Sequence, residues 1–283
     1  MVRRVVSDEE MREFLSGSRL VGNDFEGEEL ANWYRDEEVA YAEMYPAEFL
    51  ELEAYKYHAL NVRHGFSALD PRPIARALSL GGGSGAELAP VAERVGRIDV
   101  VDAAEAIPIE LPAPVHLHRA PPEGVLPFPN STFDLVTCFG VLHHIARVGD
   151  TLRELSRVCR DGARLLVREP IVSMGDWRRP RRGLTPRERG IPLPIFEELI
   201  QEAGLETLRA RPCIFSVSSL LQGRMKRSLF DDPMLTRIDD WLARLTLWNW
   251  TYHANSLVRR FRPTSVFYVL EKPALGSAVK SGD

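Results

Sequence analysis

The stretch Leu78-Ser-Leu-Gly81-Gly82-Gly83-Ser84-Gly85-Ala86-Glu87-Leu88 places four glycines within five residues, directly after a short apolar run. Glycine lets the backbone turn sharply from a strand into a helix and pass close to a ligand at the helix N-terminus. We therefore expect a strand over 77–80, a ligand-binding turn and a helix over 86–94. The glycines alone also satisfy the dinucleotide-binding fingerprint, so they leave the identity of the ligand open.

Asp102 is the second element of this pattern. It closes the apolar strand predicted over 98–101, about twenty residues after the glycines. A carboxylate at that place accepts hydrogen bonds from both hydroxyls of a ribose. Together, the turn and Asp102 favour a nucleoside-containing ligand over a simple tight turn.

Two later segments narrow the choice of ligand. The first, Leu126-Pro-Phe-Pro-Asn-Ser-Thr-Phe133-Asp-Leu-Val, continues to Gly140-Val-Leu-His143-His144 and predicts a turn, a strand over 133–139 and a short helix. The second, Thr151-Leu-Arg-Glu-Leu-Ser-Arg-Val, leads through Asp161-Gly162 into an apolar run, which predicts a helix over 150–159, a tight turn and a strand over 163–168.

With these four motifs in this order, the chain closely resembles class I S-adenosylmethionine-dependent methyltransferases, especially the ubiquinone- and menaquinone-biosynthesis branch. The resemblance covers about residues 77–169. It implies S-adenosyl-L-methionine as the cofactor, held at the ends of the first, second and fourth strands. The positions it implies are Gly81, Gly82, Gly83, Gly85, Asp102, Ala103, Phe139 and Gly140.

The chain departs from the family pattern at two places. Ser79 stands where the family usually has an acidic residue before its first glycine, and Pro121-Pro122 stands where it usually has an acid after the third strand. Both departures concern contacts to the cofactor.

The remaining pattern predicts an α/β fold: a Rossmann-like class I methyltransferase sheet, mostly parallel, with an antiparallel last strand. Residues 1–70 are expected to form an N-terminal helical cover, broken near Pro46, and 71–283 the methyltransferase core. Within that core we expect an Arg-rich loop over 171–190 and a helical insertion over 215–262 that acts as a substrate lid. Further strands are expected over 115–118, 206–210 and 265–270, and a further helix over 195–203.

His143 and His144 follow the fourth strand, at the edge where this fold opens its acceptor pocket. Histidine accepts a proton near neutral pH, so either residue is a candidate general base for a hydroxyl acceptor; packing or capping is the alternative. No metal is expected, because side chains of adjacent residues should point in different directions. His116 and His118 share a strand face, but no carboxylate or cysteine pattern completes a ligand set.

Two residue classes suggest the kind of acceptor. Six arginines lie in 171–190 and would suit an anionic group such as a phosphate; a solvated basic loop is the alternative. Aromatic residues of the cover and the insertion would suit a glycosidic or polyketide ring, although core packing is the commoner role. These are Trp33, Tyr34, Tyr55, Tyr57, Trp241, Trp248, Trp250 and Tyr252, with His253 beside them.

Composition excludes several classes of protein. The formal net charge of −4 argues against nucleic-acid binding, and no apolar run is long enough for a membrane span. Three scattered cysteines without a CxxC pair favour a reduced compartment, so we expect a cytoplasmic protein. Nothing in the sequence indicates an oligomeric state.

The sequence thus predicts methyl transfer from S-adenosylmethionine to a small or medium organic acceptor. The acceptor atom is expected to be a hydroxyl oxygen, in bacterial glycan, glycolipid or natural-product biosynthesis. An NAD-dependent oxidoreductase is the alternative enzyme, and it would explain the first two motifs but neither of the last two. A methyltransferase-like binding module without turnover is the non-enzymatic alternative.

Overall fold

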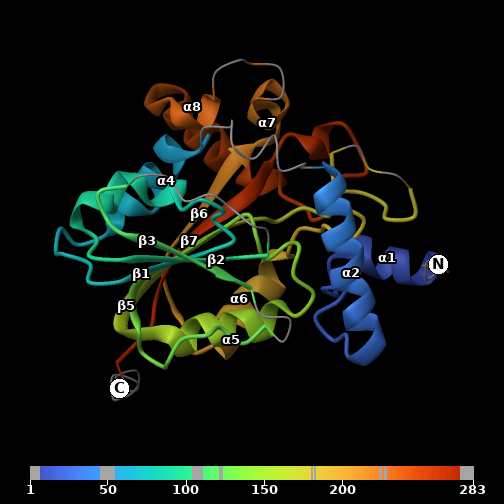
Figure 1. Ribbon diagram of the computed structural model, residues 1–283. Helices are drawn as coiled ribbons and strands as arrows, with labels where there is room; N and C mark the ends of the chain where they lie inside the picture. Colours follow the sequence, from blue (N-terminus) through green and yellow to red (C-terminus); the bar gives the residue numbers. More distant parts are fainter. Residues whose placement is uncertain are drawn as a thin grey trace, which may run out of the picture.

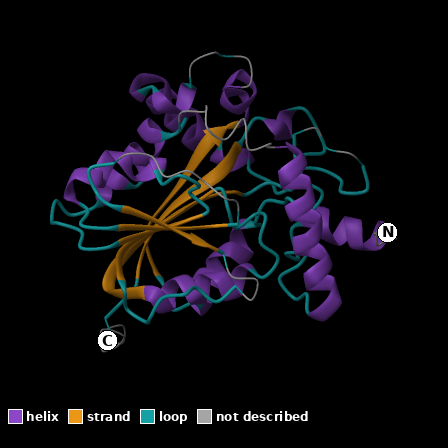
Figure 2. Cartoon of the chain, viewed as in Figure 1, coloured by secondary structure: helices purple, strands orange, loops and turns teal. Residues whose placement is uncertain are grey.

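A computed structural model describes residues 7–44, 55–103, 111–120, 124–179, 181, 183–222, 225 and 228–274. A seven-stranded sheet forms its centre (Figures 1 and 2). Its strands are β1 (Ala77–Leu80), β2 (Ile98–Asp102), β3 (Val115–Arg119), β4 (Phe133–Phe139), β5 (Cys159–Pro170), β6 (Glu206–Phe215) and β7 (Pro263–Glu271). The strand order is β3-β2-β1-β4-β5-β7-β6, and β7 alone runs antiparallel to its two neighbours. The predicted Rossmann-like fold class is confirmed.

Helices cover both faces of the sheet (Figure 1). The helical elements are α1 (Asp8–Ser16), α2 (Gly27–Met44), α4 (His58–His64), η1 (Phe66–Ala68), η2 (Ala86–Arg94), α5 (Val148–Val158), α6 (Leu193–Glu202), α7 (Ser216–Gln222), η3 (Leu229–Asp231), α8 (Pro233–Leu245), η4 (Leu247–Asn249) and η5 (Val258–Arg260). The helical insertion before the last strand is thus present, while the break predicted near Pro46 lies outside the described residues.

The alternation of side-chain direction along the strands explains why the sheet has an apolar core on each of its two faces. Leu78 and Leu80 of β1 pack with Leu152 and Phe196 of α5 and α6 on one face. Ala77 faces the other side, in the core that contains residues of α4 and η2. Successive strand side chains point to opposite faces, so a sheet buried on both sides needs nearly continuous apolar strands. Every residue of β1 is accordingly buried.

The helix predicted over 86–94 is present with these bounds. It is a 3-10 helix, and Pro90 inside it has no backbone N–H to donate. The fifth strand begins at Cys159, so Gly162, at φ +76°, lies within β5 rather than before it. The sixth strand continues to Phe215, because pairing with β7 extends along its whole length.

Candidate functional site

The glycine turn leaves β1 with three residues at positive φ: Gly81 (+65°), Gly83 (+56°) and Gly85 (+83°). A side chain at Gly81 would collide with Val141, whereas a Cβ at Gly83 would meet no atom within 4 Å. The backbone at Gly83 therefore borders open space, as close approach of a ligand requires.

Asp102 ends β2 beside this turn, and its Oδ2 accepts a hydrogen bond of 2.9 Å from the backbone N–H of Gly83. The predicted juxtaposition of the turn and the acid is therefore present. Ala103 follows it and is exposed. Phe139 ends β4, which pairs with β1, and Gly140 comes directly after it. The eight predicted cofactor positions thus gather at the carboxyl ends of three neighbouring strands, β2, β1 and β4.

A carboxylate that the sequence analysis gave no role lies beneath the turn. Glu87 is buried, and its Oε1 accepts hydrogen bonds from the hydroxyls of Ser79 and of Thr137 (3.4 Å). Its Oε2 is buried and has no partner among the described residues. A Cβ at Gly82 would strike both Ser79 and Glu87, so this glycine is needed for their contact. Burial raises the pKa of Glu87 to about 7.

The turn region therefore fits S-adenosylmethionine on three counts: open space at Gly83, an acid at the end of β2, and an unpaired buried carboxylate oxygen. Glu87 brings an acid to Ser79, the place where the family pattern carries one. The sequence signal that could have identified Glu87 was the presence of an acidic residue directly after the glycines. The second departure, Pro121-Pro122, lies outside the described residues.

His143 lies in a cluster of buried charges after β4. Its Nδ1 is 2.7 Å from Glu169 Oε2, and its Nε2 is 3.4 Å from Glu188 Oε1. Glu169 ends β5 and also accepts hydrogen bonds from the backbone N–H groups of Val141, Leu142 and His143. Burial lowers the pKa of His143, but the two carboxylates outweigh it and raise this pKa to about 9. At neutral pH the environment thus favours the imidazolium, which does not accept a further proton.

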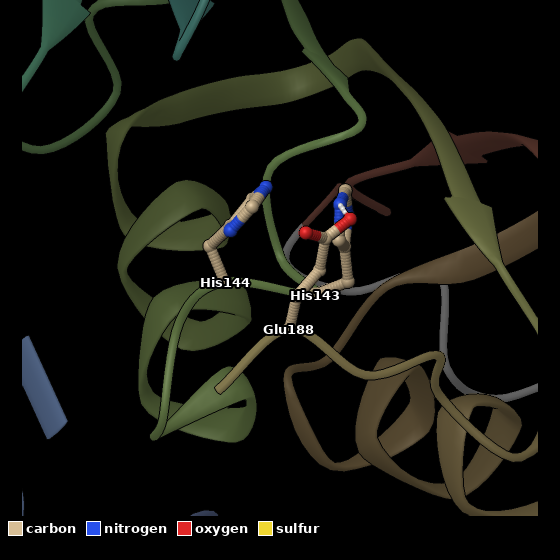
Figure 3. A group of neighbouring side chains, drawn as sticks. All are labelled: His143, His144 and Glu188. Atoms are coloured by element: carbon tan, nitrogen blue, oxygen red, sulfur yellow. Dashed lines mark ion pairs between the residues drawn. The ribbon is translucent and has the colours of Figure 1, made fainter. Parts of the chain in front are cut away.

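His144 lies against His143, with ring centroids 4.2 Å apart. Its Nδ1 is 2.7 Å from Oε2 of Glu37, which reaches the histidine from α2. The expectation that the two rings point in different directions is wrong: Figure 3 shows both beside the carboxylate of Glu188. The general-base role of His143 or His144 stays a prediction.

Four of the six arginines of 171–190 form side-chain bonds within the protein, and Arg182 lies outside the described residues. Arg178 pairs with Asp176 and Asp8, Arg187 pairs with Asp36, and Arg181 donates to the carbonyls of Thr185 and Glu188. Arg189 is fully buried and donates to the carbonyls of Val21, His143, Ile145 and Ala146. Through these bonds the segment connects the N-terminal helices to the loop that carries the two histidines. Its predicted grip on an anionic acceptor stays a prediction.

The predicted aromatic lid divides into two kinds of residue. Trp33 is fully buried and its Nε1 donates to the carbonyl of His144, while the Tyr252 hydroxyl donates to the carbonyl of Gly190. Trp241 and Trp248 are 62% and 78% exposed. Tyr57 stacks on Phe230, and the Tyr55 hydroxyl accepts a hydrogen bond from Asn61. Trp33 and Tyr252 are therefore core residues.

The strand histidines have a structural partner. Nε2 of His118 is 2.7 Å from Asp99, a buried acid that also binds Arg76 and Arg97. His116 on the same strand is exposed.

Comparison with known families identifies the core. Residues 78–167 match the family model described as a methyltransferase domain, which spans the glycine turn, the Asp102 strand and both later motifs. The chain carries a class I methyltransferase domain. It is an S-adenosylmethionine-dependent methyltransferase, with S-adenosyl-L-methionine as its cofactor. Its place in the ubiquinone-like branch stays a prediction.

Solved structures of methyltransferases are similar in fold. An S-adenosylmethionine-dependent methyltransferase from Mesorhizobium loti is 14% identical, with a TM-score of 0.50 over 78% of this chain and 99% of that chain. A putative methyltransferase from Bacillus halodurans is 18% identical, with a TM-score of 0.49 over 74% and 96% of the two chains. Comparison with curated proteins gives no significant match. Among the described residues, no helix has both the length and the apolar character to cross a bilayer.

Proposed function

We propose that this methyltransferase transfers the S-methyl group of S-adenosylmethionine to a hydroxyl oxygen of a small or medium organic acceptor. The biosynthesis of bacterial glycans, glycolipids or natural products is the context in which we place this reaction. The sulfonium already activates the methyl group, so the protein chiefly has to align donor and acceptor and exclude water. The observation that carries this proposal is the open glycine turn between two acids, Asp102 and Glu87.

Each acid has a distinct part in cofactor binding. Asp102, at the end of β2, would accept the ribose hydroxyls in place of its present contact to Gly83. Glu87, with a free oxygen beneath the turn, would accept a hydrogen bond from the cofactor's ammonium group. The turn itself, with Ala103, Phe139 and Gly140 at the neighbouring strand ends, would hold the rest of the cofactor.

The acceptor side is supported by the arrangement of the cover. Glu37 of α2 and the segment around Glu188 both reach the residues that follow β4. They meet at the edge of the sheet where β4 and β5 end, which is the ligand-binding edge of an α/β sheet. A cover that excludes water from this edge would suit a reaction in which the methyl donor and the acceptor must be aligned.

Calorimetry tests the cofactor assignment. We expect S-adenosylhomocysteine to bind the wild-type protein, and NAD not to bind. Asp102→Ala should weaken S-adenosylhomocysteine binding about 10- to 100-fold, because the ribose hydroxyls lose a charged acceptor. Asp150→Ala is the matched control and should bind normally, because this acid of α5 is only partly buried and pairs with Arg147 and Arg153.

Turnover is tested separately, with labelled S-adenosylmethionine and a panel of alcohols, phenols, sugars and amines. Label transferred to a hydroxyl compound supports the proposal. Transfer only to amines would overturn the oxygen assignment. Tight cofactor binding with no transfer to any acceptor would favour the binding module, and preferential binding of NAD the oxidoreductase.

A further inference from the structure

His143, His144 and Glu188 form a compact set of donor atoms at the acceptor side of the sheet. One nitrogen or oxygen from each lies within 4.8 Å of the other two. The histidines belong to the connection between β4 and α5, and Glu188 arrives from the segment before α6. Figure 3 shows the Glu188 carboxylate between the two imidazoles.

Both imidazoles are oriented as metal-binding histidines usually are. Nδ1 of His143 is 2.7 Å from Glu169, and Nδ1 of His144 is 2.7 Å from Glu37. A carboxylate on one ring nitrogen fixes the tautomer and leaves the other nitrogen, Nε2, as the free donor. Within the described residues, Nε2 of His144 has no hydrogen-bond partner, and Nε2 of His143 approaches only Glu188, at 3.4 Å.

The cluster also carries an excess of buried acid. Glu37, Glu169 and Glu188 are all less than 9% exposed and surround the two histidines. Arg189 is fully buried near them, but its side chain donates hydrogen bonds to carbonyl groups rather than to these carboxylates. Without a metal, His143 alone faces Glu169 and Glu188; a divalent cation would replace its Nε2 contact to Glu188 and bring two positive charges among the three acids.

We propose that His143, His144 and Glu188 bind one divalent transition-metal ion through the two Nε2 atoms and one carboxylate oxygen. Two imidazoles and a carboxylate suit Zn²⁺, Fe²⁺ or Co²⁺ better than Mg²⁺ or Ca²⁺, which prefer oxygen ligands alone. Three protein ligands leave a coordination position open, and the His144 side chain is 29% exposed, which gives access from solvent.

The open position would accept an oxygen of the acceptor. Coordination lowers the pKa of a bound hydroxyl, so its proton would pass to solvent water without a histidine acting as the base. The oxygen would then take the methyl group as the S–CH3 bond breaks and S-adenosylhomocysteine leaves. This second role rests on the proposed function, whereas metal binding itself does not.

Cobalt binding gives a direct readout. Tag-free, chelator-treated protein would be titrated with Co²⁺ while visible absorption is recorded. We expect one Co²⁺ per chain, displaced by Zn²⁺. His144→Gln and Glu188→Gln should each weaken binding more than about 100-fold. Glu37→Gln, at a residue that orients His144 and also accepts hydrogen bonds from the Thr185 hydroxyl and the Arg187 N–H, should weaken it about 10- to 100-fold.

His116→Gln, at an exposed histidine of β3, is the matched control and should bind Co²⁺ like the wild type. Melting temperature and S-adenosylhomocysteine affinity report whether each variant is folded. Absence of stoichiometric Co²⁺ binding in the wild type would overturn the metal site. Wild-type binding in folded His144→Gln and Glu188→Gln would do the same. Neither result would touch the cofactor assignment, which S-adenosylhomocysteine binding tests by itself.

Discussion

At the scale of single residues, Glu87 is the most unusual group of the cofactor side. Burial raises its pKa from 4.5 to about 7. The folded state therefore holds a proton that the unfolded state releases near pH 4.5. The stabilisation is complete below pH 4.5 and is lost as the pH rises to about 7. Between pH 5 and 8 we expect the free energy of unfolding to fall by on the order of 3 kcal/mol through this group.

Glu87→Gln provides the comparison, because glutamine keeps the size of the side chain and an oxygen acceptor for Ser79 and Thr137. Urea unfolding at several pH values would give the stability difference between wild type and variant. We expect that difference to shift in favour of the variant as the pH rises. A difference that stays constant from pH 5 to 8 would show that Glu87 has an ordinary pKa.

At the scale of elements, the packing of α5 explains why the motif over 151–158 carries a glutamate, Glu154, and an arginine, Arg157. Arg157 donates to the carbonyls of Leu126 (3.1 Å) and Phe128 (2.8 Å) and pairs with Glu154, which itself accepts from the Leu126 N–H. The pair holds the turn that leads into β4. Arg157→Met should lower the free energy of unfolding by about 1–3 kcal/mol, measured in urea, because it leaves these acceptors unsatisfied.

Arg153→Met, on the exposed side of the same helix, is the control. Its side chain is 51% exposed and pairs with Asp150. Such surface pairs contribute about 0–1 kcal/mol. Equal losses for Arg153→Met and Arg157→Met would mean that the motif does not anchor the turn.

At the scale of the whole molecule, the placement of α8 buries two of its acids and leaves several of its apolar side chains exposed. Asp239 and Asp240 are buried on its inner side, while Met234, Ile238 and Trp241 are exposed. Asp239 faces inward because it accepts the N–H groups of Ile214 (2.9 Å) and Phe215 (2.8 Å) where β6 ends. Asp239→Ala should cost about 2–5 kcal/mol of unfolding free energy, since two buried donors lose their acceptor.

Trp241→Ser tests the opposite side of α8. Exposed substitutions away from packed features usually change stability by less than about 0.5 kcal/mol, so we expect almost none of the loss caused by Asp239→Ala. Urea unfolding of both variants decides the matter. A larger loss from Trp241→Ser would mean that the tryptophan packs against the protein in solution.

The sequence by itself determined the sheet and the edge at which the predicted cofactor positions lie. Apolar strands, the glycine turn and the position of Asp102 are local signals: each is written within a few neighbouring residues, and the chain order then fixes which strand ends meet. For that reason the fold class and the gathering of the predicted cofactor positions follow from the sequence. The helix expected over 86–94 is present as well; apolar spacing did not reveal that it takes the 3-10 form, with Pro90 inside it.

Only the tertiary structure decided the partners of the charged side chains. Glu37 meets His144 across 107 residues of sequence, and Glu87 meets Ser79 because Gly82 has no side chain to separate them. The same holds for Arg178, Arg187 and Arg189, which look solvent-directed in the sequence but bind acids or carbonyls of distant segments. A buried charge must find its partner wherever the packed fold offers one, and that choice depends on three-dimensional burial rather than on neighbouring residues.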